Sequence, residues 1–64
     1  MHADLITFCQ GRPFSIERGA RVPEVGSVIY PGERGITPMK VMTLITRYDL
    51  FCQCVEVHCQ YHQE

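Results

Sequence analysis

Five side chains of the kinds that bind soft metal ions lie within eleven residues near the end of the 64-residue chain: Cys52, Cys54, His58, Cys59 and His62. Zinc in proteins takes four such ligands in a tetrahedron. Side chains two apart on a strand point the same way but lie about 6.6 Å apart, whereas two thiolates on one zinc lie within about 4 Å of each other. A Cys-x-Cys pair on a strand would therefore chelate poorly.

The better half-site is Cys59 with His62 in a turn, completed by Cys54 and by Cys9 or His58. Zinc at Cys54, His58, Cys59 and His62 is one interpretation of this cluster. The other is that the cysteines are small core residues and the histidines are solvated. The spacing matches none of the standard zinc patterns, so we expect a protein that folds without a cofactor and keep zinc as the alternative.

The same residues offer two nucleophile–base pairs, Cys59 with His62 and Cys54 with His58. Nucleophilic catalysis also needs an oriented base and a pocket for the substrate. A domain of this length buries only about 60% of the surface of its unfolded chain and has little room for such a pocket. We expect no enzyme and no catalytic residues.

Charge weighs against general nucleic-acid binding. The chain contains six Lys and Arg residues and seven Asp and Glu residues, and its formal net charge is −1. Nucleic-acid binders usually carry a basic stripe, because phosphate neutralisation supplies most of their sequence-independent affinity. Nucleic-acid contact stays an alternative, through side chains able to bind phosphates or stack on bases: Arg12, Arg18, Arg21, Lys40 and Tyr48.

Residues 1–12 lack the basic start and apolar run of a signal peptide. No stretch approaches the roughly 18 apolar residues of a membrane span. The four cysteines are therefore expected as thiols in a reducing compartment, which predicts a cytoplasmic protein without a membrane partner.

Four segments have the composition and alternation of β-strands: residues 5–9, 25–30, 37–46 and 50–57. Turn-forming residues separate them at 10–13, 31–35 and 47–49. Residues 13–23 have a proline at either end and Gly19 in the middle, and are expected to form a loop that contains one irregular turn or short strand. Residues 58–64 lack apolar periodicity and are expected to fray as a tail.

Strict alternation predicts how the last two strands divide between two faces. In residues 37–46 it places Met39 and Val41 on one face, and Met42 and Leu44 on the other. Both faces are then partly apolar, which one small core would not require. We expect a partner-binding surface formed by Met42, Leu44, Val55 and Val57, and hence a protein-interaction module that forms a homo-oligomer or binds another protein.

Residues 25–54 resemble the YodC-like family of small uncharacterised bacterial proteins. The matching segments are VGSV at 25–28, GITPMKV at 35–41 and LFCQC at 50–54. The chain departs from the family pattern at Cys54, where an aromatic residue is expected, and 24 further residues precede the matching part. The resemblance implies an SH3-like barrel and no established activity.

Together these patterns predict an all-β fold, a small SH3-like barrel of about four to five antiparallel strands. Residues 1–64 would form one domain.

Overall fold

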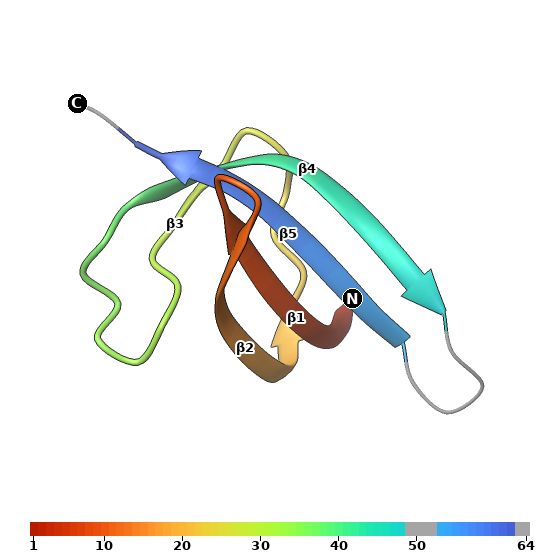
Figure 1. Ribbon diagram of the computed structural model, residues 1–64. Helices are drawn as coiled ribbons and strands as arrows, with labels where there is room; N and C mark the ends of the chain where they lie inside the picture. Colours follow the sequence, from red (N-terminus) through yellow and green to blue (C-terminus); the bar gives the residue numbers. More distant parts are fainter. Residues whose placement is uncertain (49–52, 63–64) are drawn as a thin grey trace.

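The computed structural model describes residues 1–48 and 53–62, and these residues form one curled β-sheet (Figure 1). Among them there is no helix, and so none of the length and apolar character needed to cross a membrane. The strands are β1 (His2–Cys9), β2 (Arg12–Arg21), β3 (Val28–Ile29), β4 (Met39–Tyr48) and β5 (Gln53–Tyr61). The all-β prediction is confirmed, and the curled half-barrel agrees with the expected SH3-like barrel.

The strand order in the sheet is β2-β1-β5-β4-β3. Three neighbouring pairs are antiparallel, but β1 and β5 are parallel. The prediction of antiparallel strands throughout is therefore wrong for the central pair. A parallel pair needs a long connection between its strands, and here β2, β3 and β4 lie along that connection.

The β1–β2 hairpin closes through a two-residue turn at Gln10 and Gly11, whose φ angles are 53° and 78°. Positive φ at both positions is typical of a type I′ turn, which matches the twist of a hairpin. The prediction of a loop with at most a short strand over residues 13–23 is wrong, because the ten-residue strand β2 runs to Arg21. As an edge strand, β2 tolerates Pro13 within it.

Two irregularities in β2 hide its strand periodicity from the sequence. Register shifts occur where it pairs with Ala3/Leu5 and with Thr7/Phe8 of β1. At the first, Gly19 adopts φ 59° and its N–H donates a 2.9 Å hydrogen bond to Asp4 Oδ1. Glycine suits this left-handed conformation because it has no Cβ.

The other predicted strands begin or end at different residues in the structure. Only Val28 and Ile29 of residues 25–30 form a strand, although the N–H of Gly26 donates to the carbonyl of Val41 at 2.8 Å. The prediction of a frayed tail is wrong for residues 58–61, because they continue β5 and pair with β4. Residues 47 and 48 belong to β4 rather than to a connection, and the predictions for 49–52 and 63–64 lie outside the described residues.

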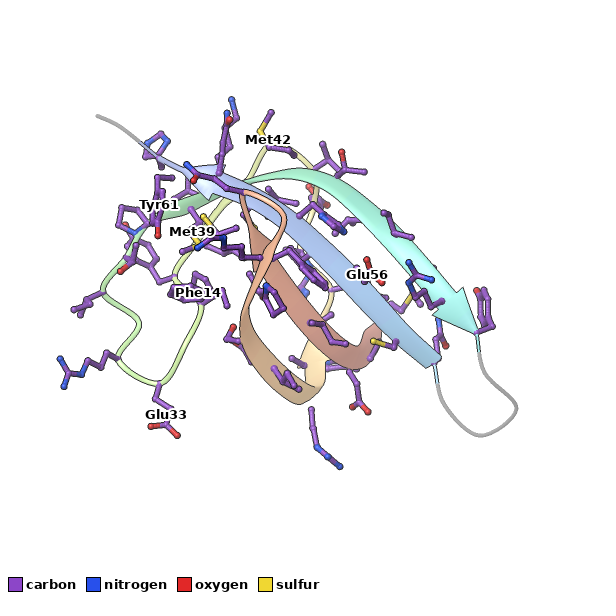
Figure 2. All side chains as sticks on the ribbon, in the orientation of Figure 1. Phe14, Glu33, Met39, Met42, Glu56 and Tyr61 are labelled. Atoms are coloured by element: carbon purple, nitrogen blue, oxygen red, sulfur yellow. The ribbon has the colours of Figure 1, made fainter. Side chains whose placement is uncertain are left out.

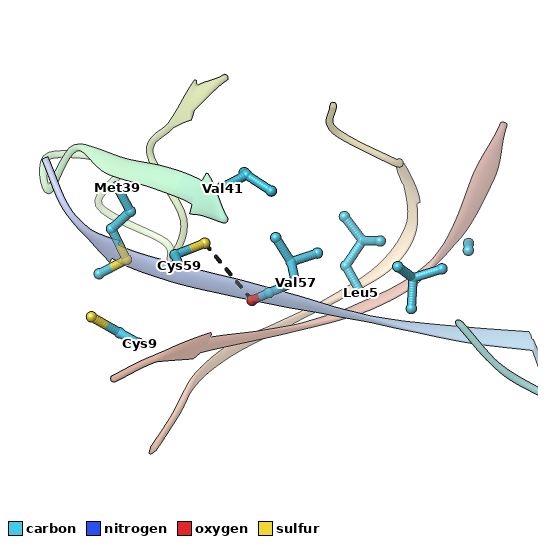
Figure 3. Close-up of a cluster of buried hydrophobic side chains, with 8 residues drawn as sticks. Leu5, Cys9, Met39, Val41, Val57 and Cys59 are labelled. Atoms are coloured by element: carbon cyan, nitrogen blue, oxygen red, sulfur yellow. Dashed lines mark hydrogen bonds between the residues drawn. The ribbon is translucent and has the colours of Figure 1, made fainter. Parts of the chain in front are cut away.

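The core lies on the inner, concave face of the sheet and is drawn in Figure 3. Alternate residues of β1, β4 and β5 point into it, as strand geometry requires. Met39, Val41, Val55 and Val57 are fully buried, and the other members are Ala3, Leu5, Cys9 and Cys59. Because β5 is flanked by β1 and β4, its valines form the centre of this core.

A β-bulge in β4 decides which side chains reach the core. Val41 pairs with Cys59 and Thr43 pairs with His58, so Met42 is an extra residue between them. One inserted residue reverses the faces of all positions beyond it. Leu44 therefore joins Met39 and Val41 on the inner side, paired with Val57, while Ile45 is on the outer side, paired with Glu56.

Candidate functional site: the outer face of the sheet

We use outer face for the side of the sheet opposite the core. The register places Ile16, Ile6, Glu56 and Ile45 side by side across it, on β2, β1, β5 and β4 respectively. Ile16 and Ile45 are exposed, whereas Ile6 is half-buried between its neighbours. Three isoleucines therefore form an apolar row interrupted by one carboxylate.

A second row crosses the same strands, two residues further along β1. It contains Pro13, Phe8, His58 and Thr43. The rings of Phe8 and His58 are stacked, with centroids 4.8 Å apart and an interplanar angle of 5°. This stack joins the two parallel strands across the outer face, and ring pairs of this kind stabilise beyond the apolar area that they bury.

Glu56 connects the two rows through its carboxylate. His58 Nε2 lies 3.0 Å from Glu56 Oε1, and the Nε–H of Arg47 donates to Glu56 Oε2. The hydrogen bond from His58 lowers the pKa of the Glu56 carboxyl from its ordinary value of 4.5, and Arg47 lowers it further, whereas burial acts in the opposite direction. We call Arg47, Glu56 and His58 the polar triad; Figure 2 labels Glu56 on β5.

The lowered pKa of Glu56 predicts a loss of stability in acid. Because the folded pKa lies below the unfolded one, the stabilisation is complete above about pH 4.5 and is lost as pH falls through the folded pKa. Glu56→Gln should therefore lower the urea midpoint at pH 7 and should lower it much less at pH 3. Urea denaturation of both proteins at the two pH values measures this, and an equal difference at both would contradict it.

The structure separates the residues predicted to form the partner surface. Met42 is exposed at the bulge and points away from the sheet (Figure 2). Val55 and Val57 are fully buried, and Leu44 packs against the core. Their assignment to an exposed face is wrong, because strict alternation does not allow for the bulge.

An apolar second face nevertheless exists, and other residues form it. Sequence reasoning missed Ile6, Ile16 and Ile45 on this face, as well as the polar triad. Alternation within β1 separates Leu5 and Cys9 from Ile6 and could have indicated the first of them. Nothing local indicates that β1 lies beside β5.

The residues predicted for nucleic-acid contact are spread over the molecule. Arg12 and Arg21 are at opposite ends of β2, and Lys40 and Tyr48 are near opposite ends of β4. Each of these ten-residue strands spans roughly 30 Å. Two strands separate β2 from β4, so these side chains and Arg18 do not form one basic stripe.

The structure does not bring the predicted zinc ligands together either. Along β5, Cys59 points into the core while Cys54 and His58 lie on the outer face. The N–H of His62 donates to the carbonyl of Pro38 beyond the strand. In the part of the chain that the structure describes, no three His, Cys, Asp or Glu side chains gather as a metal site.

A hollow of about 350 Å³ lies at one end of the molecule, between Phe14 and the loop that joins β3 to β4. Its lining is Phe14, Pro31, Gly32, Glu33, Arg34, Gly35, Ile36 and Thr37. This lining contains no nucleophile beside a histidine, the arrangement that covalent catalysis requires. The outer face combines exposed apolar side chains with hydrogen-bonded polar groups, and it is therefore the candidate site.

Comparison of the chain with protein-family models, curated proteins and solved structures found no match. The resemblance to the YodC-like family therefore stays a prediction.

Proposed function

We propose that this chain is a non-catalytic protein-interaction module that associates with a second copy of itself through the outer face. The observation that carries the proposal is the apolar row on that face. Ile16 is 68% exposed, Ile45 39% and the nearby Met42 45%. Exposed apolar residues gathered on one face of a small domain are typical of a protein contact.

Surface area supports the same conclusion. The accessible surface is 4873 Å², whereas a compact monomer of this mass has about 4,200 Å². The excess of about 670 Å² is close to the roughly 800 Å² that each partner buries in an interface of standard size. A dimer through one sheet face would cover an area of this order.

The polar triad suits a buried interface. Removing a charge from water is costly unless it is paired and hydrogen-bonded. On this face Glu56 is already paired with Arg47 and with His58 within one chain. A second copy would therefore cover charges that have partners, and the Phe8–His58 stack offers it an ordered surface.

The arrangement of the row favours a second copy as the partner. A two-fold interface must be self-complementary. Ile16 and Ile45 are exposed at opposite ends of the row. A two-fold axis along the strands, between β1 and β5, would set Ile16 of one copy against Ile45 of the partner subunit.

A cytoplasmic location belongs to this proposal. Cys9, Cys54 and Cys59 are all free thiols, and disulfides are rare where the compartment is reducing.

The test is the oligomeric state measured by light scattering coupled to size exclusion. The wild-type chain should have twice the mass of the 7.4 kDa monomer. Ile45→Lys should weaken the dimer on the order of 10-fold or more, since each apolar side chain loses about 1.5–3 kcal/mol of burial. Ile36→Lys is the matched control, because Ile36 is equally apolar and 71% exposed but lies in the β3–β4 loop.

Three results would contradict the proposal. A strict monomer at high concentration would exclude self-association, and salt-dependent retention of that monomer on single-stranded DNA would favour nucleic-acid contact instead. A dimer unaffected by Ile45→Lys would place Ile45 outside the interface, as in pairing through the edge strand β2, which two strands separate from β4. An equal effect of Ile36→Lys would show that the outer face is not the interface.

A further inference from the structure

Three sulfur-bearing side chains lie together at one end of the core: Cys9, Met39 and Cys59 (Figure 3). Cys9 and Cys59 are directly opposite each other on the parallel strands β1 and β5, and both are buried on the inner face. Met39 is fully buried on β4, where it pairs with Tyr61, two residues beyond Cys59. Met39 and Cys59 are thus diagonal neighbours.

The spacing of these strands brings the sulfur atoms within reach of one ion. Neighbouring strands are about 4.8 Å apart, and side chains on one face of an in-register pair are parallel. Two thiolates on one metal at about 2.3 Å are about 4 Å apart in a trigonal arrangement. Diagonal neighbours are about 7–8 Å apart, a distance that a long side chain such as Met39 spans.

We propose that Cys9, Cys59 and Met39 form a binding site for one Cu(I) ion. Thiolate together with thioether selects Cu(I), whereas structural zinc takes four ligands drawn from thiolates and imidazoles. Each thiol releases its proton on binding, so two thiolates and one Cu(I) carry a net charge of −1. Arg12, the in-register neighbour of Cys9 on β2, supplies a cation nearby.

In the free protein both cysteines are buried core residues. The Cys59 thiol is directed toward the Val57 carbonyl, to which it donates a 3.7 Å hydrogen bond. Binding requires rotation of this side chain toward Cys9, from one staggered rotamer to another. Burial raises the pKa of the Cys59 thiol, and the neighbouring Cys9 raises it further.

An access route leads to the site from solvent. Cys9 lines a hollow of about 560 Å³ together with Gln10, Arg12, Pro13, Phe14 and Tyr61. A metal delivered to this hollow reaches Cys9 first. The site is on the inner face, opposite the proposed dimer surface, so its test is independent of the oligomeric state.

The test is an anaerobic titration of the full chain with Cu(I) held by a coloured chelator. The wild type should remove one equivalent of Cu(I). Cys9→Ser and Cys59→Ser should each weaken binding on the order of 100-fold or more, and Met39→Leu on the order of 10-fold, because a neutral thioether is a weaker donor to the metal than a charged thiolate. Cys54→Ser is the matched control on the outer face and should bind as the wild type does.

X-ray absorption of the Cu(I)-loaded wild type gives a result that does not depend on how the variants fold. We expect sulfur atoms to be the only ligands of the copper ion. Nitrogen or oxygen ligands would overturn the proposal, as would wild-type affinity in folded Cys9→Ser and Cys59→Ser proteins. A loss of binding in Cys54→Ser equal to that in Cys59→Ser would place the copper elsewhere and overturn it too.

Discussion

Replacing Val57 by lysine should leave the chain unfolded at 25 °C. Val57 is fully buried on the central strand β5, between Thr7 of β1 and Leu44 of β4. An ammonium group placed there costs several kcal/mol because it loses its hydration and finds no partner. A 64-residue domain has about 3–10 kcal/mol of stability in all, so this one change approaches or exceeds the total.

Far-UV circular dichroism and urea denaturation measure the effect. Met42→Lys is the matched control, since strict alternation places Met42 and Val57 on one face while the structure places them on opposite sides of the sheet. At a concentration where the wild type is monomeric, Met42→Lys should change the free energy of unfolding by about 0.5 kcal/mol or less. A folded Val57→Lys protein would show that the strand faces are assigned wrongly.

The second large effect is expected at Met39, where truncation to alanine should cost about 2–5 kcal/mol. Deleting a fully buried side chain loses its transfer free energy and leaves a cavity that the neighbours fill only in part. Met39 is fully buried on β4. Met39→Leu keeps most of the volume and should cost less than about 1.5 kcal/mol.

Met42→Ala is the matched control for Met39→Ala, because both methionines are on β4 and Met42 is exposed whereas Met39 is fully buried. It should cost about 0.5 kcal/mol or less. Chemical denaturation of the three variants, with an unchanged slope against denaturant, gives these free energies. Equal costs for Met39→Ala and Met42→Ala would mean that the burial assigned to these two side chains is wrong.

Different parts of the fold were open to prediction to different degrees. The strand content followed from β-branched alternation bounded by turns, and the hairpin turn after Cys9 from the Gly11–Pro13 segment. The strand β2 was missed because Pro13 and Gly19 look like loop residues and are tolerated here only at an edge and at a bulge. The end of β5 was missed because residues 58–61 lack apolar alternation and are ordered by pairing with β4.

The candidate site depended still more on contacts between distant residues. Alternation in the last two predicted strands indicated an apolar second face formed by Met42, Leu44, Val55 and Val57, whereas the structure forms that face from Ile6, Ile16 and Ile45. The residues that form this face could not be read from the sequence. On β4, one inserted residue at Met42 reverses the face of every side chain after it, Ile45 included. The stack of Phe8 on His58 requires β1 to lie in register beside β5, about fifty residues away in the chain.

The sequence by itself determined that this chain forms strands and turns, because those preferences are local and each is expressed within a few residues. Only the tertiary structure decided which strands are neighbours and which side chains share a face. The parallel pairing of β1 with β5 brings Cys9 to Cys59 in the core and Ile6 to Glu56 on the outer face. Such pairing is selected by the burial of the whole inner face at once, so no single segment of the chain encodes it.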